Sequence, residues 1–126
     1  MSKYFARVKS IGIDIEEEVV LDINGVEVIC FAGVCPYEIH EGKEYPVSFE
    51  LVIFDDYIVE ESFDDAARLE RIDDGFSYWI EGKLEGGVVN SLISFEDEIL
   101  LSDYQYLNGK YIRMKVDRID VEFLNK

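Results

Sequence analysis

The stretch EEVVLDINGVEVICFA, residues 17–32, decides the fold class of this chain. Two runs rich in β-branched residues, 17–23 and 26–32, flank the dipeptide Asn24-Gly25. A type I′ turn needs positive φ angles at both of its central residues, and Asn-Gly meets that need at low cost. The stretch therefore predicts an antiparallel hairpin with a two-residue turn.

The same alternation of apolar and polar side chains runs through most of the chain, and a period of two residues is typical of half-buried strands. An irregular connection is expected over residues 33–46, which contain two prolines and two glycines. Further strands are predicted over residues 3–13, 45–54, 76–84, 88–95 (with 99–101 as an extension) and 110–123. Together they predict one mainly β, antiparallel domain over residues 1–126. Its six to seven strands and one short helix would form a closed or partly open, OB-like barrel, or a two-layer sandwich.

The last predicted strand changes phase along its length. Ile112 and Val116 share one face, but Ile119 and Phe123 lie on the other face of a regular strand. A slip of one residue near Asp117 would restore a continuous inward face, so the pattern predicts a β-bulge or a sharp bend there.

A short helix is predicted around residues 62–72. Ser62 with Asp65 three residues later is typical of a helix N-terminus, where negative charge is favoured. Arg68 and Arg71 would lie near the other end of this helix, where the helix dipole favours positive charge. The helix would explain one of three aspartate pairs, and turns would explain the other two.

The chain carries 28 acidic and 12 basic residues and a net charge of −16. Such a charge repels the phosphate backbone of nucleic acids and anionic lipid headgroups, and it attracts basic proteins. General binding to nucleic acid or to membranes is therefore not expected. The alternative that the acidity serves only solubility stays open.

The N-terminal sequence MSKYFARVKSIG lacks the apolar run of a signal peptide, and no segment has the length of a membrane helix. A cytoplasmic location is expected, in which Cys30 and Cys35 would be reduced. Their C-x4-C spacing differs from redox and zinc motifs, and His40 is the single histidine. No cofactor and no metal site are therefore predicted.

Catalysis is not expected either. Cys35, His40 and a nearby carboxylate could form a nucleophilic triad, but their spacing in a loop is unspecific. Pairs of carboxylates arise by chance among so many acids, so they do not indicate a glycosidase. Calcium loops of the usual pattern are absent, although the Asp-Asp pairs could still donate oxygen ligands to calcium.

Basic residues gather on two predicted strands. Lys3, Arg7 and Lys9 would share one face of the first strand, and Arg113 and Lys115 one face of the last. If the two strands paired, these five cations would lie together. They would then either neutralise neighbouring acids across the sheet or form an anion-binding patch.

Aromatic residues among carboxylates indicate a site for Lys and Arg side chains, although they also suit a barrel core. Such residues include Tyr57, Tyr78, Trp79, Tyr104 and Tyr106. The residues expected to contact a basic protein are Asp55, Asp56, Tyr57, Glu60, Glu61, Asp73 and Asp74.

A small, acidic, cytoplasmic domain without catalytic residues resembles the bacterial immunity proteins that neutralise toxins. The resemblance implies a non-catalytic protein that binds a basic partner, such as a toxic nuclease, and whose charge speeds the association. The alternative is a β-barrel of unknown role that binds a small ligand or a metal. An exposed acidic patch with tyrosine or tryptophan would favour the first reading, and a concave apolar pocket the second.

Overall fold

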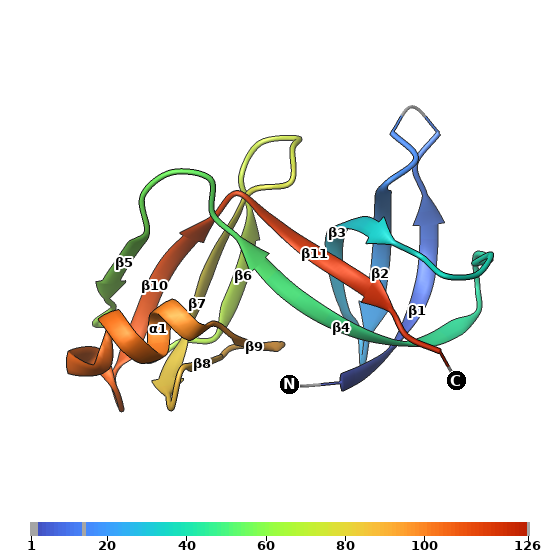
Figure 1. Ribbon diagram of the computed structural model, residues 1–126. Helices are drawn as coiled ribbons and strands as arrows, with labels where there is room; N and C mark the ends of the chain where they lie inside the picture. The colour runs from blue at the N-terminus through green and yellow to red at the C-terminus, as the bar shows by residue number, and fades with distance from the viewer. Residues whose placement is uncertain (1–2, 14, 126) are drawn as a thin grey trace.

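The computed structural model describes residues 3–13 and 15–125, and its strands form two β-sheets (Figure 1). The first sheet is a closed barrel of Lys3–Ile11 (β1), Glu18–Ile23 (β2), Val26–Val34 (β3), Glu44–Val52 (β4) and Arg118–Phe123 (β11). The second is a six-stranded sheet of Ile58–Glu61 (β5), Arg68–Arg71 (β6), Tyr78–Glu85 (β7), Val88–Asn90 (β8), Ser94–Glu96 (β9) and Tyr111–Val116 (β10). The helix Glu98–Asp103 (α1) and the 3-10 turn Gln105–Leu107 (η1) connect β9 to β10.

The barrel strands follow the order β1-β2-β3-β11-β4, and β4 closes the ring by pairing with β1. The pairings are antiparallel except for the parallel contact between β3 and β11. The interior is filled by alternate side chains of each strand, among them Ala6, Val8 and Leu21, which are fully buried. A small barrel filled in this way has a packed core and no channel.

The predicted hairpin is confirmed as the pair β2–β3. Ile23 faces Val26 across the turn, and Asn24 and Gly25 have φ angles of 52° and 89°. The N–H of Gly25 also donates to Asp22 Oδ1 over 2.8 Å, so a side chain of β2 stabilises the turn. The two positive φ angles are those of a type I′ turn.

The phase change in residues 110–123 marks the point where the chain passes from one sheet to the other. β10 belongs to the six-stranded sheet and β11 to the barrel, and Figure 1 shows the turn between them. At this turn the Asp117 N–H donates to the Val52 carbonyl oxygen over 2.9 Å, and Asp117 Oδ2 accepts the Phe54 N–H over 2.7 Å. The predicted bend is therefore confirmed, and it lets both halves of the segment turn their alternate apolar side chains inward.

The six-stranded sheet branches at β7. One edge of β7 pairs with β10, whereas β6 and β8 share its other edge end to end. Gly82 lies at the branch, where a Cβ atom would approach the Asn90 carbonyl oxygen to 2.4 Å. The hydroxyl of Ser91 bonds the carbonyl oxygens of Arg68 and Glu81 and so joins the two half-edges.

Polar and aromatic contacts fix the two sheets against each other. The Tyr4 hydroxyl accepts the Ser94 N–H over 3.0 Å. The rings of Phe49 on β4 and Phe95 on β9 meet edge to face, with centroids 5.8 Å apart. The buried side chains of both sheets belong to one hydrophobic cluster.

The predicted fold class, a mainly β protein built from an antiparallel barrel or two layers, is confirmed. The described residues form eleven strands where six to seven were expected. The increase arises because the long segments 88–95 and 110–123 each divide into two strands, and because β5 and β6 were not anticipated.

The helix predicted over residues 62–72 is wrong. Ser62 Oγ bonds both the N–H and the carbonyl oxygen of Asp64, which forms a local turn in place of a helix cap. Arg68–Arg71 is strand β6, and Leu69 faces Ile80 on β7. Phe63, assigned to the apolar stripe of the helix, is 88% exposed. Pairing with β7 therefore outweighs local helix propensity here.

The helix that exists, α1, covers residues that were assigned to a strand extension. Asp97 caps it by accepting the Ile99 N–H at Oδ1 over 2.8 Å, and Glu98 places a negative charge in its first turn. Leu100 is its buried residue.

The two strands whose pairing would have brought five cations together do not pair. β1 pairs with β2 and β4, so Arg7 and Lys9 lie in the barrel, whereas Arg113 and Lys115 lie on β10 in the other sheet. The side chain of Lys3 lies outside the described residues.

Candidate binding site

An open cleft of about 560 Å³ separates β4 from the β7–β8 turn and the start of α1. Its lining residues are Phe49, Glu50, Leu51, Tyr57, Gly86, Gly87, Glu96, Asp97, Glu98, Ile99 and Leu101. We call this feature the acidic cleft, because four of its lining side chains are carboxylates.

The four carboxylates come from two segments that are distant in sequence. Glu50 projects outward from β4 because its neighbours Phe49 and Leu51 turn toward the core. Glu96, Asp97 and Glu98 span the end of β9 and the first turn of α1. Strand pairing places β9 beside β8, and α1 begins directly after β9 at its cap residue Asp97.

Tyr57 and Asp97 form the best-defined polar contact of the cleft. The Tyr57 hydroxyl donates to Asp97 Oδ2 over 2.9 Å and approaches Oδ1 at 3.2 Å. Burial raises the pKa of Tyr57 above its ordinary value, and the hydrogen bond to the Asp97 carboxylate raises it further. Since Asp97 also caps α1, one carboxylate ties the segment after β4 to the helix.

Tyr57 also begins a row of three tyrosine rings that ends in η1. The rings of Tyr57 and Tyr104 stack with centroids 6.3 Å apart, and Tyr106 follows at 6.1 Å from Tyr104. Burial raises the pKa of Tyr104 as well, with smaller effects of Tyr106 and Asp103. Tyr106 is 68% exposed, so aromatic surface is available beside the cleft.

The apolar part of the cleft depends on the glycine turn between β7 and β8. Gly86 and Gly87 have φ angles of 59° and 79°, which side chains adopt only with strain. A Cβ atom on Gly87 would stand 2.8 Å from the Cβ of Leu101, whereas one on Gly86 would meet nothing within 4 Å. Gly87 therefore allows α1 to approach the turn, with Ile99 and Leu101 still partly exposed in the cleft.

Asp55 and Asp56, predicted as partner contacts, lie exposed between β4 and β5. With Lys115 and Asp117 they line a second, smaller hollow of about 200 Å³. They precede Tyr57 directly, so they lie close to the acidic cleft in sequence but do not line it.

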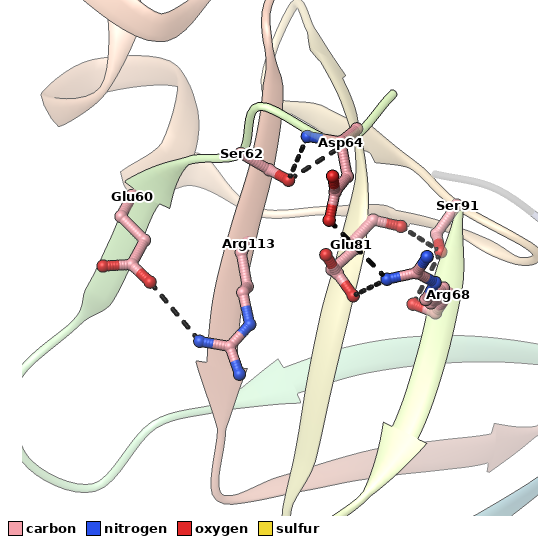
Figure 2. A network of polar contacts seen from close by, with 7 residues as sticks. All are labelled: Glu60, Ser62, Asp64, Arg68, Glu81, Ser91 and Arg113. Atoms are coloured by element: carbon pink, nitrogen blue, oxygen red, sulfur yellow. Dashed lines mark hydrogen bonds and ion pairs between the residues drawn. The ribbon is translucent and has the colours of Figure 1, made fainter. Parts of the chain in front are cut away.

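Glu60 and Glu61 lie on the edge strand β5. Glu60 Oε1 is 3.4 Å from Arg113 Nη1, a pair that Figure 2 shows crossing from β5 to β10. Glu61 Oε1 is 3.5 Å from Lys110 Nζ. Both carboxylates thus already have a cation beside them, which reduces their share of the outward field.

Asp73 and Asp74 lie in the turn after β6 and face solvent. The side chain of Arg71 donates to the carbonyl oxygens of Asp74 and Gly75. Arg71 therefore stabilises this turn through its backbone carbonyl groups. β5 and β6 are separated by β10 and β7, which places the turn about 14 Å from β5 across the sheet. The seven predicted residues therefore do not form one patch.

The outer face of the six-stranded sheet carries a row of charges in place of an open aromatic site. Arg68 Nη1 lies 3.5 Å from Glu81 Oε2, and Figure 2 shows that the same guanidinium also contacts Asp64. Glu81 is only 8% exposed. The guanidinium of Arg113 covers the Trp79 ring, with 3.5 Å from its carbon to the ring centroid. Trp79 is therefore already occupied by a cation of its own chain.

Sequence reasoning missed all four carboxylates of the cleft, namely Glu50, Glu96, Asp97 and Glu98. A signal for part of them was present, because Asp97-Glu98 before an apolar run of three residues is typical of a helix N-terminus. No local pattern indicates that Glu50 on β4 faces this helix.

Cys35 and His40, which were considered for catalysis, do not contact each other through a hydrogen bond in the described part of the chain. The Cys35 thiol donates to the Tyr37 carbonyl oxygen over 3.0 Å, and His40 Nε2 lies 4.0 Å from Glu38. Within residues 3–13 and 15–125, no hydrogen bond connects Cys35 with His40, and no group of three or more His, Cys, Asp or Glu side chains has a metal-binding arrangement.

Neither α1 nor η1 has the length or the apolar run needed to cross a bilayer, and the described part of the chain offers no other candidate. No curated protein and no solved structure matches the sequence. One family matches residues 1–124, nearly the whole chain. The chain therefore belongs to the family described as uncharacterised conserved protein UCP019853.

Proposed function

We propose that this protein is a non-catalytic binding protein that engages a basic protein partner at the acidic cleft. The observation that carries the proposal is the convergence of four carboxylates with partly exposed Tyr57, Ile99 and Leu101 in one hollow of a chain with net charge −16. Lysine and arginine combine a cationic head with an apolar stem, so they match both parts of this lining.

Local charge supports the choice of partner. The ion pairs of the described residues engage other acids, such as Glu60, Glu61 and Glu81, and none of them involves Glu50 or Glu98. Carboxylates that are not neutralised by their own chain concentrate negative potential in a hollow and attract cationic partners. Complementary charge then acts on the rate of association and on the choice of partner more than on affinity alone.

Neutralisation of a cationic toxin, such as a nuclease, is one activity of this kind. It would require no reactive group on this chain, because occupation of the toxin's basic surface suffices. The surface acids that do not line the cleft, including Asp55 and Asp56, would then contribute to the field around it.

The volume of the cleft favours a second candidate, a binding site for a small cationic or amphipathic ligand. Pockets for small ligands commonly measure about 300–1,000 Å³, and the cleft lies within that range. Its mixed apolar and acidic lining would suit an organic amine.

A capture experiment separates the two candidates. The immobilised protein is offered a panel of basic proteins, acidic proteins of similar size and small organic amines at low ionic strength. Saturable binding of basic proteins alone supports the proposal, and binding of amines alone supports the second candidate. Failure to retain any basic protein contradicts the proposal.

A further inference from the structure

We propose that the free edge of β5 receives an extended basic segment of the partner as an added strand. This inference rests on the proposed function and specifies how the partner would bind. It starts from the position of β5, the first strand in the order of its sheet, which Figure 1 shows at the outer side of the molecule. Within the described residues, β5 pairs with β10 on one edge and with no strand on the other.

The register of β5 determines which backbone groups face outward. The Ser62 N–H donates to the Tyr111 carbonyl oxygen over 2.8 Å, so positions 62, 60 and 58 exchange hydrogen bonds with β10. The alternate positions, Val59 and Glu61, face Met114 and Ile112 in pairs without hydrogen bonds. Their N–H and carbonyl groups therefore point to the free edge, where an added strand would find them.

The charge around the free edge of β5 favours a basic segment over a second copy of this chain. Exposed acids flank the strand on both sides, with Asp55 and Asp56 before it and Asp64 and Asp65 after it. A second copy of this chain would bring the same acids and its own net charge of −16 against them, which opposes pairing between copies. A segment rich in lysine or arginine would meet opposite charge at both ends.

The edge is continuous with the acidic cleft. Tyr57, which lines the cleft and bonds Asp97, directly precedes Ile58, the first residue of β5. One partner segment could thus pair with β5 and place its next basic side chain in the cleft. Main-chain hydrogen bonds would supply affinity, and the cleft would supply specificity.

The test compares two synthetic peptides of equal charge. One alternates lysine with threonine over seven residues and can pair as a strand, and the other has proline in place of threonine and lacks those N–H donors. We expect the wild-type protein to bind the lysine–threonine peptide about tenfold more tightly, measured by titration calorimetry, because the added strand gains backbone hydrogen bonds. Equal affinity for the two peptides would overturn the inference while leaving the proposed function intact.

Matched variants locate the binding. Val59→Pro removes an outward N–H and leaves the bonds to β10, whereas Val59→Ala loses similar side-chain packing but keeps the N–H. We expect Val59→Pro to abolish the tenfold preference and Val59→Ala to keep it. Glu61→Pro and Glu61→Ala form a second pair with the same logic, for use if Val59→Pro does not fold.

Other outcomes assign the edge differently. Retention of the preference in both proline variants would place the peptide elsewhere and overturn the inference. A wild-type dimer in solution that Val59→Pro dissociates would assign the edge to a second copy. Failure of both peptides to bind at low salt would contradict the inference and the proposed function together.

Discussion

The hydroxyl of Tyr57 donates a 2.9 Å hydrogen bond to Oδ2 of Asp97, the residue that caps α1. Tyr57 lies in the connection from β4 of the barrel to β5, and Asp97 lies between β9 and α1. Both residues line the acidic cleft. The bond therefore joins two residues that line the cleft and fixes the position of α1 relative to β5. A change at either residue should affect both the stability of the protein and the shape of the site.

Replacement of Tyr57 by Phe should lower the free energy of unfolding by about 1 kcal/mol, because it removes one partly buried hydrogen bond and keeps the ring. Denaturant unfolding measures this difference. Tyr106→Phe is the matched control, since the Tyr106 side chain is mostly exposed. Equal stability of the two variants would show that the bond to Asp97 contributes nothing.

Stability should decrease at alkaline pH in a way that depends on Tyr57. Burial and the bond to Asp97 raise the pKa of Tyr57 above its ordinary value of 10.0. The folded state therefore holds the phenolic proton more tightly than the unfolded state does. This contribution is complete below about pH 10 and is lost as the pH rises above it. Unfolding measured between pH 9 and pH 12 should show a smaller decrease for Tyr57→Phe than for the wild type. Parallel curves would contradict the assigned role of Tyr57.

The glycine turn beneath α1 gives a prediction with an internal control. Gly86→Ala and Gly87→Ala both place a side chain at positive φ, which costs on the order of 1 kcal/mol. Only Gly87→Ala also brings a Cβ atom to 2.8 Å from Leu101. Gly87→Ala should therefore destabilise the protein by about 1–3 kcal/mol more than Gly86→Ala, as measured by thermal or denaturant unfolding. Similar losses for both variants would mean that α1 does not pack on this turn.

The two cysteines should differ sharply toward a thiol reagent. Cys35 is exposed, whereas Cys30 is buried, and burial raises its pKa, with a smaller effect of Asp120. Since the thiolate is the reactive form, native protein at pH 8 should react rapidly at one thiol and unfolded protein at two. Rapid reaction of both thiols in the native state would contradict the placement of Cys30 in the barrel core.

Much of the fold could be predicted from sequence because its signals are local. Asn24-Gly25 specifies its own turn, and the alternation on both sides sets the register of β2 and β3. The phase change near Asp117 indicated a bend for a physical reason, since a segment whose two halves belong to different sheets must change face between them. The branch of the six-stranded sheet at Gly82 has no such signal, because it depends on how β6 and β8 divide one edge of β7.

The helix assignment failed because short segments are decided by distant partners. Arg68–Arg71 has acceptable helix propensity, but all four of its residues pair with Tyr78–Glu81 of β7. The run Ile99–Leu101 is too short to distinguish strand from helix by period, and the cap at Asp97 decides in favour of helix. The candidate site was predictable only at Tyr57, since the four carboxylates of the cleft gather through tertiary structure.

The most direct measurement of partner binding is the rate of association with a captured basic protein, followed as a function of salt. Glu50→Gln/Glu98→Gln removes two charges from the acidic cleft, and Glu27→Gln/Glu122→Gln removes two exposed charges from the barrel. At low salt we expect the first pair to slow association about tenfold and to flatten its salt dependence, and the second pair to change it less than about twofold. Equal rates for the two double variants would contradict binding at the cleft.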